Sequence, residues 1–205
     1  MRRKIQLKKR KENLRRELKL ILIVCEGEKT ERTYFKEFRR RNNGIRIEVP
    51  NCSFKDPLNL TKFAKKMKSA YDIDLKKGDM ICCVFDVDSN KNDMIEEAKR
   101  DADNDNIEII LSNPCFELWY ILHFEFTTAH MSTSQAFQKL KRKYIPGYQK
   151  NRSYFNQLKL HLSRAIENAQ KLNSFHEKNL TPLFSTESNP STQVFKLVQH
   201  IINLD

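Results

Sequence analysis

Acidic side chains follow two apolar segments of this 205-residue chain, at the points where each segment is expected to end as a strand. Glu26 comes directly after the run KLILIVC, and Asp86 and Asp88 close the run MICCVFDVD. Continuous apolar runs of this length with β-branched residues are typical of strands that are buried on both faces. An i, i+2 spacing puts both aspartates on the same side of an extended strand. The spacing therefore favours a shared role for Asp86 and Asp88 at the end of this strand.

These carboxylates would meet if the two strands are neighbours, since parallel strands share one carboxyl edge and lie about 5 Å apart. Three unpaired carboxylates so close together repel one another, and their pKa values rise unless a cation compensates them. Mg²⁺ suits this role because it takes oxygen ligands, keeps several waters and bridges to phosphate oxygens. The pattern predicts a Mg²⁺ or Mn²⁺ site with Glu26, Asp86 and Asp88 as ligands.

The residues around Glu26 leave a second interpretation open. A glutamate in the first turn of a helix often does no more than complement the helix dipole, which could be the whole role of Glu28 and Glu31. A single Asp-x-Asp pair is also common by chance. Gly27 argues for a ligand, since a residue without a Cβ leaves room at the strand end. The joint order, Glu-Gly after one apolar strand and Asp-x-Asp after a later one, favours the metal site.

The segments that must position these acids alternate between strand and helix patterns. We expect strands at residues 19–25, 45–50, 80–88 and 107–113, and helices at residues 30–41, 57–71, 92–103 and 114–124. This alternation predicts an α/β fold with an open parallel sheet of about four strands, flanked by helices. Pro114 is expected in the first helical turn, with Ser112 or Asn113 as the N-cap. Glu117 would lie one turn into that helix, either as a further ligand or as a capping-box glutamate.

Residues 127–205 change character and are expected to form a mainly helical extension that packs on the core. The predicted organisation is a basic arm (residues 1–19), an α/β core (20–126) and this extension (127–205). The extension interleaves aromatic residues with a basic set, namely Lys141, Arg142, Lys143, Lys150 and Arg152. Such a mixture suits single-stranded or looped nucleic acid, but a solvated face that meets a partner protein is an equal alternative. Lys29, beside the acids, could contact a phosphate or lie only at the surface.

The chain carries a formal net charge of +12, and the excess is uneven. Residues 1–19 hold ten Lys or Arg against two Glu, a net charge of +8, which leaves +4 for the other 186 residues. A basic arm on a mildly basic body favours a polyanion as binding partner. A solubilising tail is the alternative, whereas a membrane-surface helix is disfavoured because the arm has few large apolar residues.

The five cysteines favour a reducing compartment. No Cys-x-x-Cys pair is present, and no group of Cys and His has zinc spacing. No apolar segment approaches the length of a membrane span, and no small-residue cleavage site follows the basic start. We therefore expect free thiols and a cytoplasmic protein.

Two of these motifs, IVCEG and VFDVD, resemble the Toprim domain, a metal-dependent core shared by primases, type II topoisomerases and OLD-type nucleases. The resemblance is closer to the RloB family, which is related to the AbiLii abortive-infection proteins. It rests on CEGEKTERTYF, FDVDS, SNPCFELWYILHF, YIPGYQKN and NPSTQVFKLV, which together span residues 20–198. A run as long as SNPCFELWYILHF rarely arises by chance.

The resemblance implies a Toprim-like fold of four parallel strands and a role for each acid. Glu26 would be the acid/base glutamate, and Asp86 and Asp88 the metal-binding pair. OLD-type nucleases carry an extra glutamate shortly into the first helix, for which Glu31 is the nearest match, although Thr30 occupies the expected position. The resemblance also implies an ATPase partner of the ABC or AAA type and a role in phage defence.

Two functions of different classes remain in view. The first is a Mg²⁺-dependent nuclease, the effector of a defence system, in which Glu31 and Glu117 are candidate ligands of a second metal. The second is a non-catalytic module that recognises nucleic acid or holds an ATPase partner. A pure scaffold has no need of Glu26, Asp86 and Asp88 together, so the sequence favours the nuclease. DNA and RNA are indistinguishable as substrates, because the groups that contact phosphate are the same for both.

Overall fold

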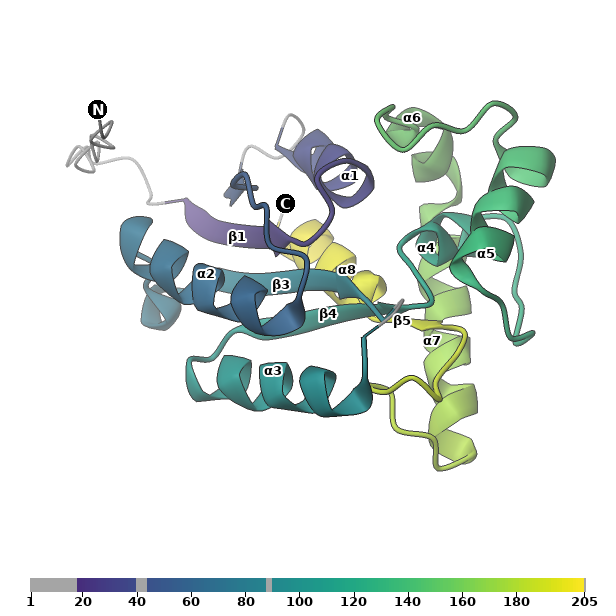
Figure 1. Ribbon diagram of the computed structural model, residues 1–205. Coiled ribbons are helices and arrows are strands. Elements are labelled where there is room, and N and C mark those ends of the chain that lie inside the picture. The colour runs from purple at the N-terminus through teal and green to yellow at the C-terminus, as the bar shows by residue number, and fades with distance from the viewer. Residues whose placement is uncertain (1–17, 40–43, 88–89, 205) are drawn as a thin grey trace.

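A five-stranded sheet forms the centre of the protein, and four of its strands run parallel (Figure 1). The computed structural model describes residues 18–39, 44–87 and 90–204. The strands are β1 (Lys19–Cys25), β2 (Ile45–Glu48), β3 (Met80–Asp86), β4 (Glu108–Asn113) and β5 (Ser191–Thr192). Their order is β2-β1-β3-β4-β5, with the short β5 antiparallel to β4. The expected parallel strands are confirmed, and β5 is an addition that the sequence patterns did not predict.

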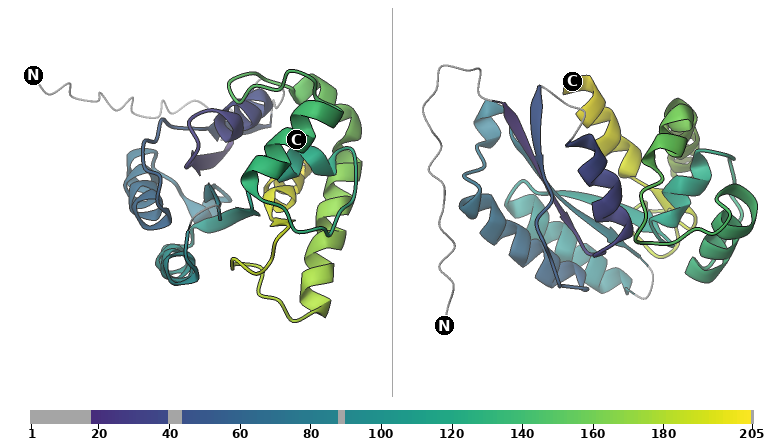
Figure 2. Two further views of the ribbon diagram at one scale, coloured as in Figure 1. Left: turned by 45° about the vertical axis from the view of Figure 1, so that its right-hand side comes forward. Right: turned by 90° about the horizontal axis from the view of Figure 1, so that it is seen from above.

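Helices lie on both faces of this sheet and extend beyond its carboxyl edge (Figure 2). They are α1 (Thr30–Phe38), α2 (Pro57–Ala70), α3 (Asn92–Asn104), α4 (Glu117–Leu122), α5 (Thr133–Lys139), α6 (Phe155–Leu158), α7 (Leu162–Lys178) and α8 (Val194–Leu204). The described residues also contain short 3-10 turns at Leu75–Lys77 and Lys159–His161, and a π-helical turn at Leu140–Tyr144. The predicted open α/β architecture is confirmed.

Successive side chains of the inner strands point to opposite faces of the sheet, because side chains alternate along a strand. Leu22 and Cys83 belong to the cluster that packs against α2 and α3. Ile23 and Cys82 belong to the cluster that packs against α1, α8 and the helices between them in the chain. The adjacent cysteines therefore divide between the two faces, as their position in an apolar run predicts. All five cysteines are buried and free.

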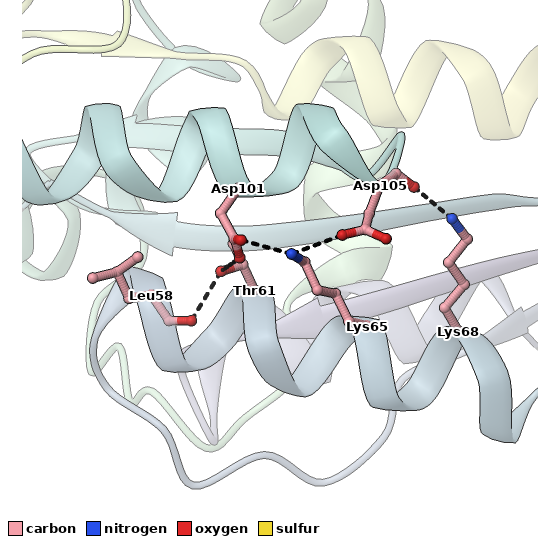
Figure 3. Close-up of polar contacts among 6 residues, drawn as sticks. All are labelled: Leu58, Thr61, Lys65, Lys68, Asp101 and Asp105. Atoms are coloured by element: carbon pink, nitrogen blue, oxygen red, sulfur yellow. Dashed lines mark hydrogen bonds and ion pairs between the residues drawn. The ribbon is translucent and has the colours of Figure 1, made fainter.

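Polar side chains join α2 to α3 on one side of the sheet (Figure 3). The ammonium group of Lys65 lies 2.6 Å from Asp101 Oδ1 and 2.7 Å from Asp105 Oδ2. Thr61 Oγ1 donates to Asp101 Oδ2 at 3.0 Å, and Lys68 Nζ donates to the backbone carbonyl of Asp105 at 2.5 Å. These contacts hold the two helices side by side where they cover the sheet.

The helix after β4 begins later than expected. α4 starts at Glu117 and has no side-chain hydrogen bond at its N-cap. The side-chain amide of Asn113 donates instead to the backbone carbonyls of Ser185 and Thr186, each at 3.1 Å. The prediction of a helix that begins at residue 114 with an N-cap directly before it is therefore wrong. Asn113 binds a loop that lies far away in the sequence, which local patterns do not reveal.

The extension packs against the same core as the sheet. The ring of Tyr34 in α1 lies 5.5 Å from that of Phe155 in α6 and 6.5 Å from that of Trp119 in α4, measured between centroids. One hydrophobic cluster runs from strand residues such as Ile23 to Leu172 of α7 and Leu197 of α8. Within the described ranges, no helix is long and apolar enough to cross a membrane.

Candidate functional site: a carboxylate pocket

The carboxyl ends of β1 and β3 lie side by side, as the spacing of their acids predicts. Cys25 is opposite Val84 in the parallel ladder, and the backbone N–H of Glu26 donates to the carbonyl of Val84 at 2.9 Å. The backbone N–H of Asp86 donates in turn to Glu26 Oε2 at 3.2 Å. The glutamate after one strand is thus held directly against the aspartate that ends the other. Asp88, the third predicted ligand, lies outside the described residues.

Gly27 and Glu31 fit together at the start of α1. Glu31 lies in the first turn of this helix and is only 6% exposed. A Cβ atom at residue 27 would lie 1.9 Å from Glu31 Oε2, far closer than any real contact. A side chain at residue 27 would therefore displace the Glu31 carboxylate, so glycine allows this carboxylate to occupy the strand end. The room that Gly27 was predicted to leave is filled by a side chain of the same chain.

Burial and neighbouring carboxylates raise the pKa values of Asp86 and Glu31. Burial is the main cause that raises the pKa of Asp86 well above its ordinary value, and the charges of Glu31, Glu117 and Glu26 add to it. Burial also raises the pKa of Glu31 to about 7, with a further increase from Glu117 and an opposing effect from Lys150. Asp86 Oδ1 is buried and has no hydrogen-bond partner within the described part of the chain.

Glu117 connects three segments that are distant in the sequence. It is the first residue of α4 and is 1% exposed. Its Oε1 atom accepts a hydrogen bond from the Tyr148 hydroxyl at 2.9 Å and a longer one from Thr30 Oγ1 at 3.4 Å. The ammonium group of Lys150 lies 3.5 Å from the same oxygen. The capping-box interpretation of Glu117 is therefore wrong, and its carboxylate belongs to the acidic site.

A pocket of about 330 Å³ lies over these acids. Its lining is mostly charged and consists of Glu26, Gly27, Glu28, Lys29, Thr30, Glu31, Lys55, Asp86 and Lys150. Of the basic residues predicted to bind nucleic acid, Lys29 and Lys150 reach this pocket. Lys143 instead pairs with Glu125 at 2.9 Å, and Lys141, Arg142 and Arg152 are exposed on the extension. These four residues do not line the pocket, and their binding of nucleic acid stays a prediction.

Three residues of the site were missed by sequence reasoning. Thr30 and Tyr148 bind Glu117, and Lys55 lines the pocket. Tyr148 lies within the motif YIPGYQKN, which was recognised as a family segment without a role for this hydroxyl. Lys55 precedes a predicted helix in a segment with no distinguishing pattern. Only the contacts between distant segments show that these side chains belong together.

The donor set suits a hard divalent cation such as Mg²⁺, because it consists of carboxylate oxygens and includes a buried oxygen that no described residue hydrogen-bonds. The acids lie near enough for their charges to raise the pKa values of Asp86 and Glu31. Among residues 18–39, 44–87 and 90–204, however, no three His, Cys, Asp or Glu side chains are already arranged to hold a metal ion. The chemistry of the site therefore fits such an ion, and the full set of ligands is not formed by the described residues alone.

The fold and the pocket define an α/β protein with coupled carboxylates at the carboxyl edge of a mostly parallel sheet. A family model described as "RloB-like protein" matches residues 21–201, which cover the sheet, the pocket and the helical extension. The chain therefore belongs to the RloB-like family, as the motifs in its sequence indicate. No significant match was found among curated proteins or among solved structures.

Proposed function

We propose that the protein is a Mg²⁺-dependent nuclease of the Toprim type, which hydrolyses phosphodiester bonds of DNA or RNA. The observation that carries this proposal is the buried Oδ1 atom of Asp86, which has no hydrogen-bond partner among the described residues, with Glu26, Glu31 and Glu117 close enough to raise the pKa of Asp86. Burying several carboxylates together is costly unless a cation compensates them. A site that retains this cost for structural reasons alone is harder to explain than a site that binds a cation.

The carboxylates divide into two groups of candidate ligands. Glu26 and Asp86 lie in contact at the two strand ends and would hold the ion, with Asp88 as the predicted third ligand. Glu31 of α1 and Glu117 of α4 lie near Asp86. They would bind a second metal ion or orient Glu26 and Asp86. A bound Mg²⁺ would neutralise charge on the phosphate and lower the pKa of a water molecule.

Glu26 has a second task in the proposed reaction besides holding the ion, and two lysines of the pocket would assist it. Glu26 is oriented by the backbone N–H of Asp86 and would accept the proton of the attacking water. Lys29 and Lys150 line the same pocket and would hold the phosphate beside the acids. The pocket thus combines lysines, which would attract a polyanion, with carboxylates, which would hold a cation.

Membership of the RloB-like family supports the biological part of the proposal. We infer from it that the nuclease acts as the effector of a phage-defence or abortive-infection system. Its expected partner is an ATPase of the ABC or AAA type. Such a partner would control when the pocket meets nucleic acid.

The proposal is tested with the purified full chain and end-labelled DNA and RNA, each single- and double-stranded, in Mg²⁺, Mn²⁺ or EDTA. We expect cleavage with either metal ion and none in EDTA. Glu26→Gln and Asp86→Asn should each slow cleavage roughly 100-fold or more, since one removes a proton acceptor and the other a ligand. Glu37→Gln, a charge change on α1 outside the pocket, is the matched control. Cleavage that survives the Glu26→Gln/Asp86→Asn double variant would refute the site.

A non-catalytic module that recognises nucleic acid or holds the ATPase is the second candidate. It is favoured by one observation, the lack of a ready three-ligand arrangement within the described ranges. Isothermal titration calorimetry with Mg²⁺ and Mn²⁺ separates the two candidates. Binding of either ion that disappears in Asp86→Asn supports the nuclease, whereas no metal binding together with intact nucleic-acid binding supports the module.

A further inference from the structure

Phe54 presents an aromatic ring to solvent in the segment between β2 and α2. Its side chain is 39% exposed, although burial of a phenylalanine ring normally stabilises a fold. The ring is supported from within the protein by Phe63 of α2, at 5.7 Å between centroids and an interplanar angle of 51°. The ring is therefore backed by a second aromatic residue while part of it stays open to a ligand.

The segment that carries Phe54 adjoins the carboxylate pocket. The side chain of its neighbour Lys55 lines that pocket together with Glu26 and Asp86. Three residues before Phe54, the side-chain oxygen of Asn51 accepts a hydrogen bond from the guanidinium group of Arg32 in α1. These contacts hold the segment beside the pocket, and the exposed ring belongs to the residue next to Lys55.

The charges of two glutamates that line the pocket also affect a side chain of this segment. Burial raises the pKa of the Cys52 thiol, and the nearby charges of Glu26 and Glu28 raise it further, while Arg32 lowers it. Cys52 lies two residues before Phe54, so the acids and the exposed ring belong to one neighbourhood.

We propose that Phe54 stacks on a base of single-stranded nucleic acid whose adjacent phosphate is held by Lys55 at the carboxylate pocket. That the ligand is nucleic acid rests on the proposed function. Every base has a π-face that can stack on an aromatic ring, which makes such contacts tolerant of sequence. In a duplex these faces are covered by neighbouring base pairs, and a protein ring reaches one only if the duplex is opened. The site therefore selects single-stranded segments, loops or ends.

The inference is tested by fluorescence anisotropy with labelled 12-nucleotide DNA and RNA strands and with the matching duplexes, in EDTA so that nothing is cleaved. Phe54→Ala should bind the single strands roughly 5- to 150-fold more weakly than the unmodified chain, because it loses the stacking on one base. Phe54→Trp should retain the affinity, and its fluorescence should be quenched by the bound strand. Trp119 contributes only a constant background, because it is fully buried.

Phe175→Ala is the matched control, since Phe175 is a similarly exposed phenylalanine (41%) on α7. It should bind single strands as the unmodified chain does. Three results would overturn the inference: equal affinity of Phe54→Ala and Phe175→Ala, an unquenched Phe54→Trp at saturation, or no binding of single strands by the unmodified chain. Affinity for the duplex equal to that for the single strand would also overturn it. If Phe54 proves to stack on single strands but the chain shows no metal-dependent cleavage, the proposed nuclease activity is refuted and the proposed binding site is not.

Discussion

The carboxylate of Glu31 is held where its negative charge is unfavourable. It lies against Gly27, is almost fully buried, and faces Glu117 and Asp86. Lys150 opposes this effect but does not cancel it, so the pKa of Glu31 rises to about 7. At neutral pH this side chain is therefore divided between its protonated and its charged form. A cation and a proton should compete for it.

This competition predicts a stability that depends on pH and on metal. Because the folded pKa of Glu31 is raised from 4.5 to about 7, its protonated form stabilises the fold below pH 4.5, and this contribution is lost as the pH rises to 7. We expect the melting temperature to fall over this range. Mg²⁺ should restore it more at pH 8 than at pH 6, since an ion that binds only the folded state stabilises it.

Differential scanning fluorimetry at constant ionic strength checks this prediction. Glu31→Gln should flatten the pH dependence and reduce the effect of Mg²⁺, whereas Glu37→Gln on the same helix should change neither. An unchanged pH profile in Glu31→Gln would show that another group is responsible. The readout needs no substrate, so it holds even if cleavage requires a partner protein.

At the scale of elements, α2 and α3 are joined by a small network around Lys65. Its ammonium group bridges Asp101 and Asp105, and it lowers the pKa of Asp101 by donating a hydrogen bond to the charged carboxylate. Partly exposed pairs of this kind are worth up to about 1 kcal/mol each. Lys65→Met should therefore lower the melting temperature by roughly 2–4 °C for a chain of this size.

Thermal melts at two pH values and two salt concentrations test the network. Asp101 has a lowered pKa, so its contribution should be present above its ordinary pKa of about 3.9 and disappear as the pH falls below it. High salt should reduce the difference between the unmodified chain and Lys65→Met by screening. Lys66→Met, an exposed lysine on the same helix, is the control and should melt like the unmodified chain.

The elements themselves were largely predictable, and the reason is visible in their side chains. The apolar runs at β1 and β3 are continuous because both faces of these strands are buried, so their position follows from the sequence alone. The start of α4 was not predictable. Pro114 has the local signature of a first helical turn, but Asn113 before it is committed to carbonyls of the loop near Ser185. The long-range hydrogen bonds of Asn113, and not the local preference of Pro114 for a first helical turn, therefore decide where α4 begins.

At the scale of the whole molecule, the pocket is completed by the helical extension. Lys150 comes from the segment after α5, and its ammonium group faces Glu117 of α4 and lines the pocket with Glu26. We expect Lys150→Met to slow cleavage at least roughly tenfold, because a phosphate would lose its partner next to the acids. The same change should raise the pH at which Glu31 loses its proton, since Lys150 holds that pKa down.

Cleavage assays and the pH dependence of melting measure these two effects independently. Lys141→Met removes an exposed charge from the same extension and serves as the control. Lys150→Arg should retain part of the activity. If Lys150→Met and Lys141→Met behave alike in both assays, the extension contributes only general positive charge.

The acids at the strand ends could be predicted, whereas the side chains around them could not. Glu26 and Asp86 follow from the topology, because neighbouring parallel strands bring their carboxyl ends together. Tyr148 and Thr30 meet at Glu117 although they are 118 positions apart in the sequence. No periodicity or local motif in the sequence predicts such a long-range contact. It depends on how the extension is packed against α1 and α4.

This shared packing restricts how the protein can change over evolutionary time. Replacement of the extension by a module from an unrelated protein would leave Tyr34 and Trp119 without the rings and helices that cover them. It would also remove Tyr148 and Lys150 from the acids in the same event. New specificities in this lineage are therefore more accessible through point substitutions at the pocket rim, such as at Phe54, than through recombination of whole domains.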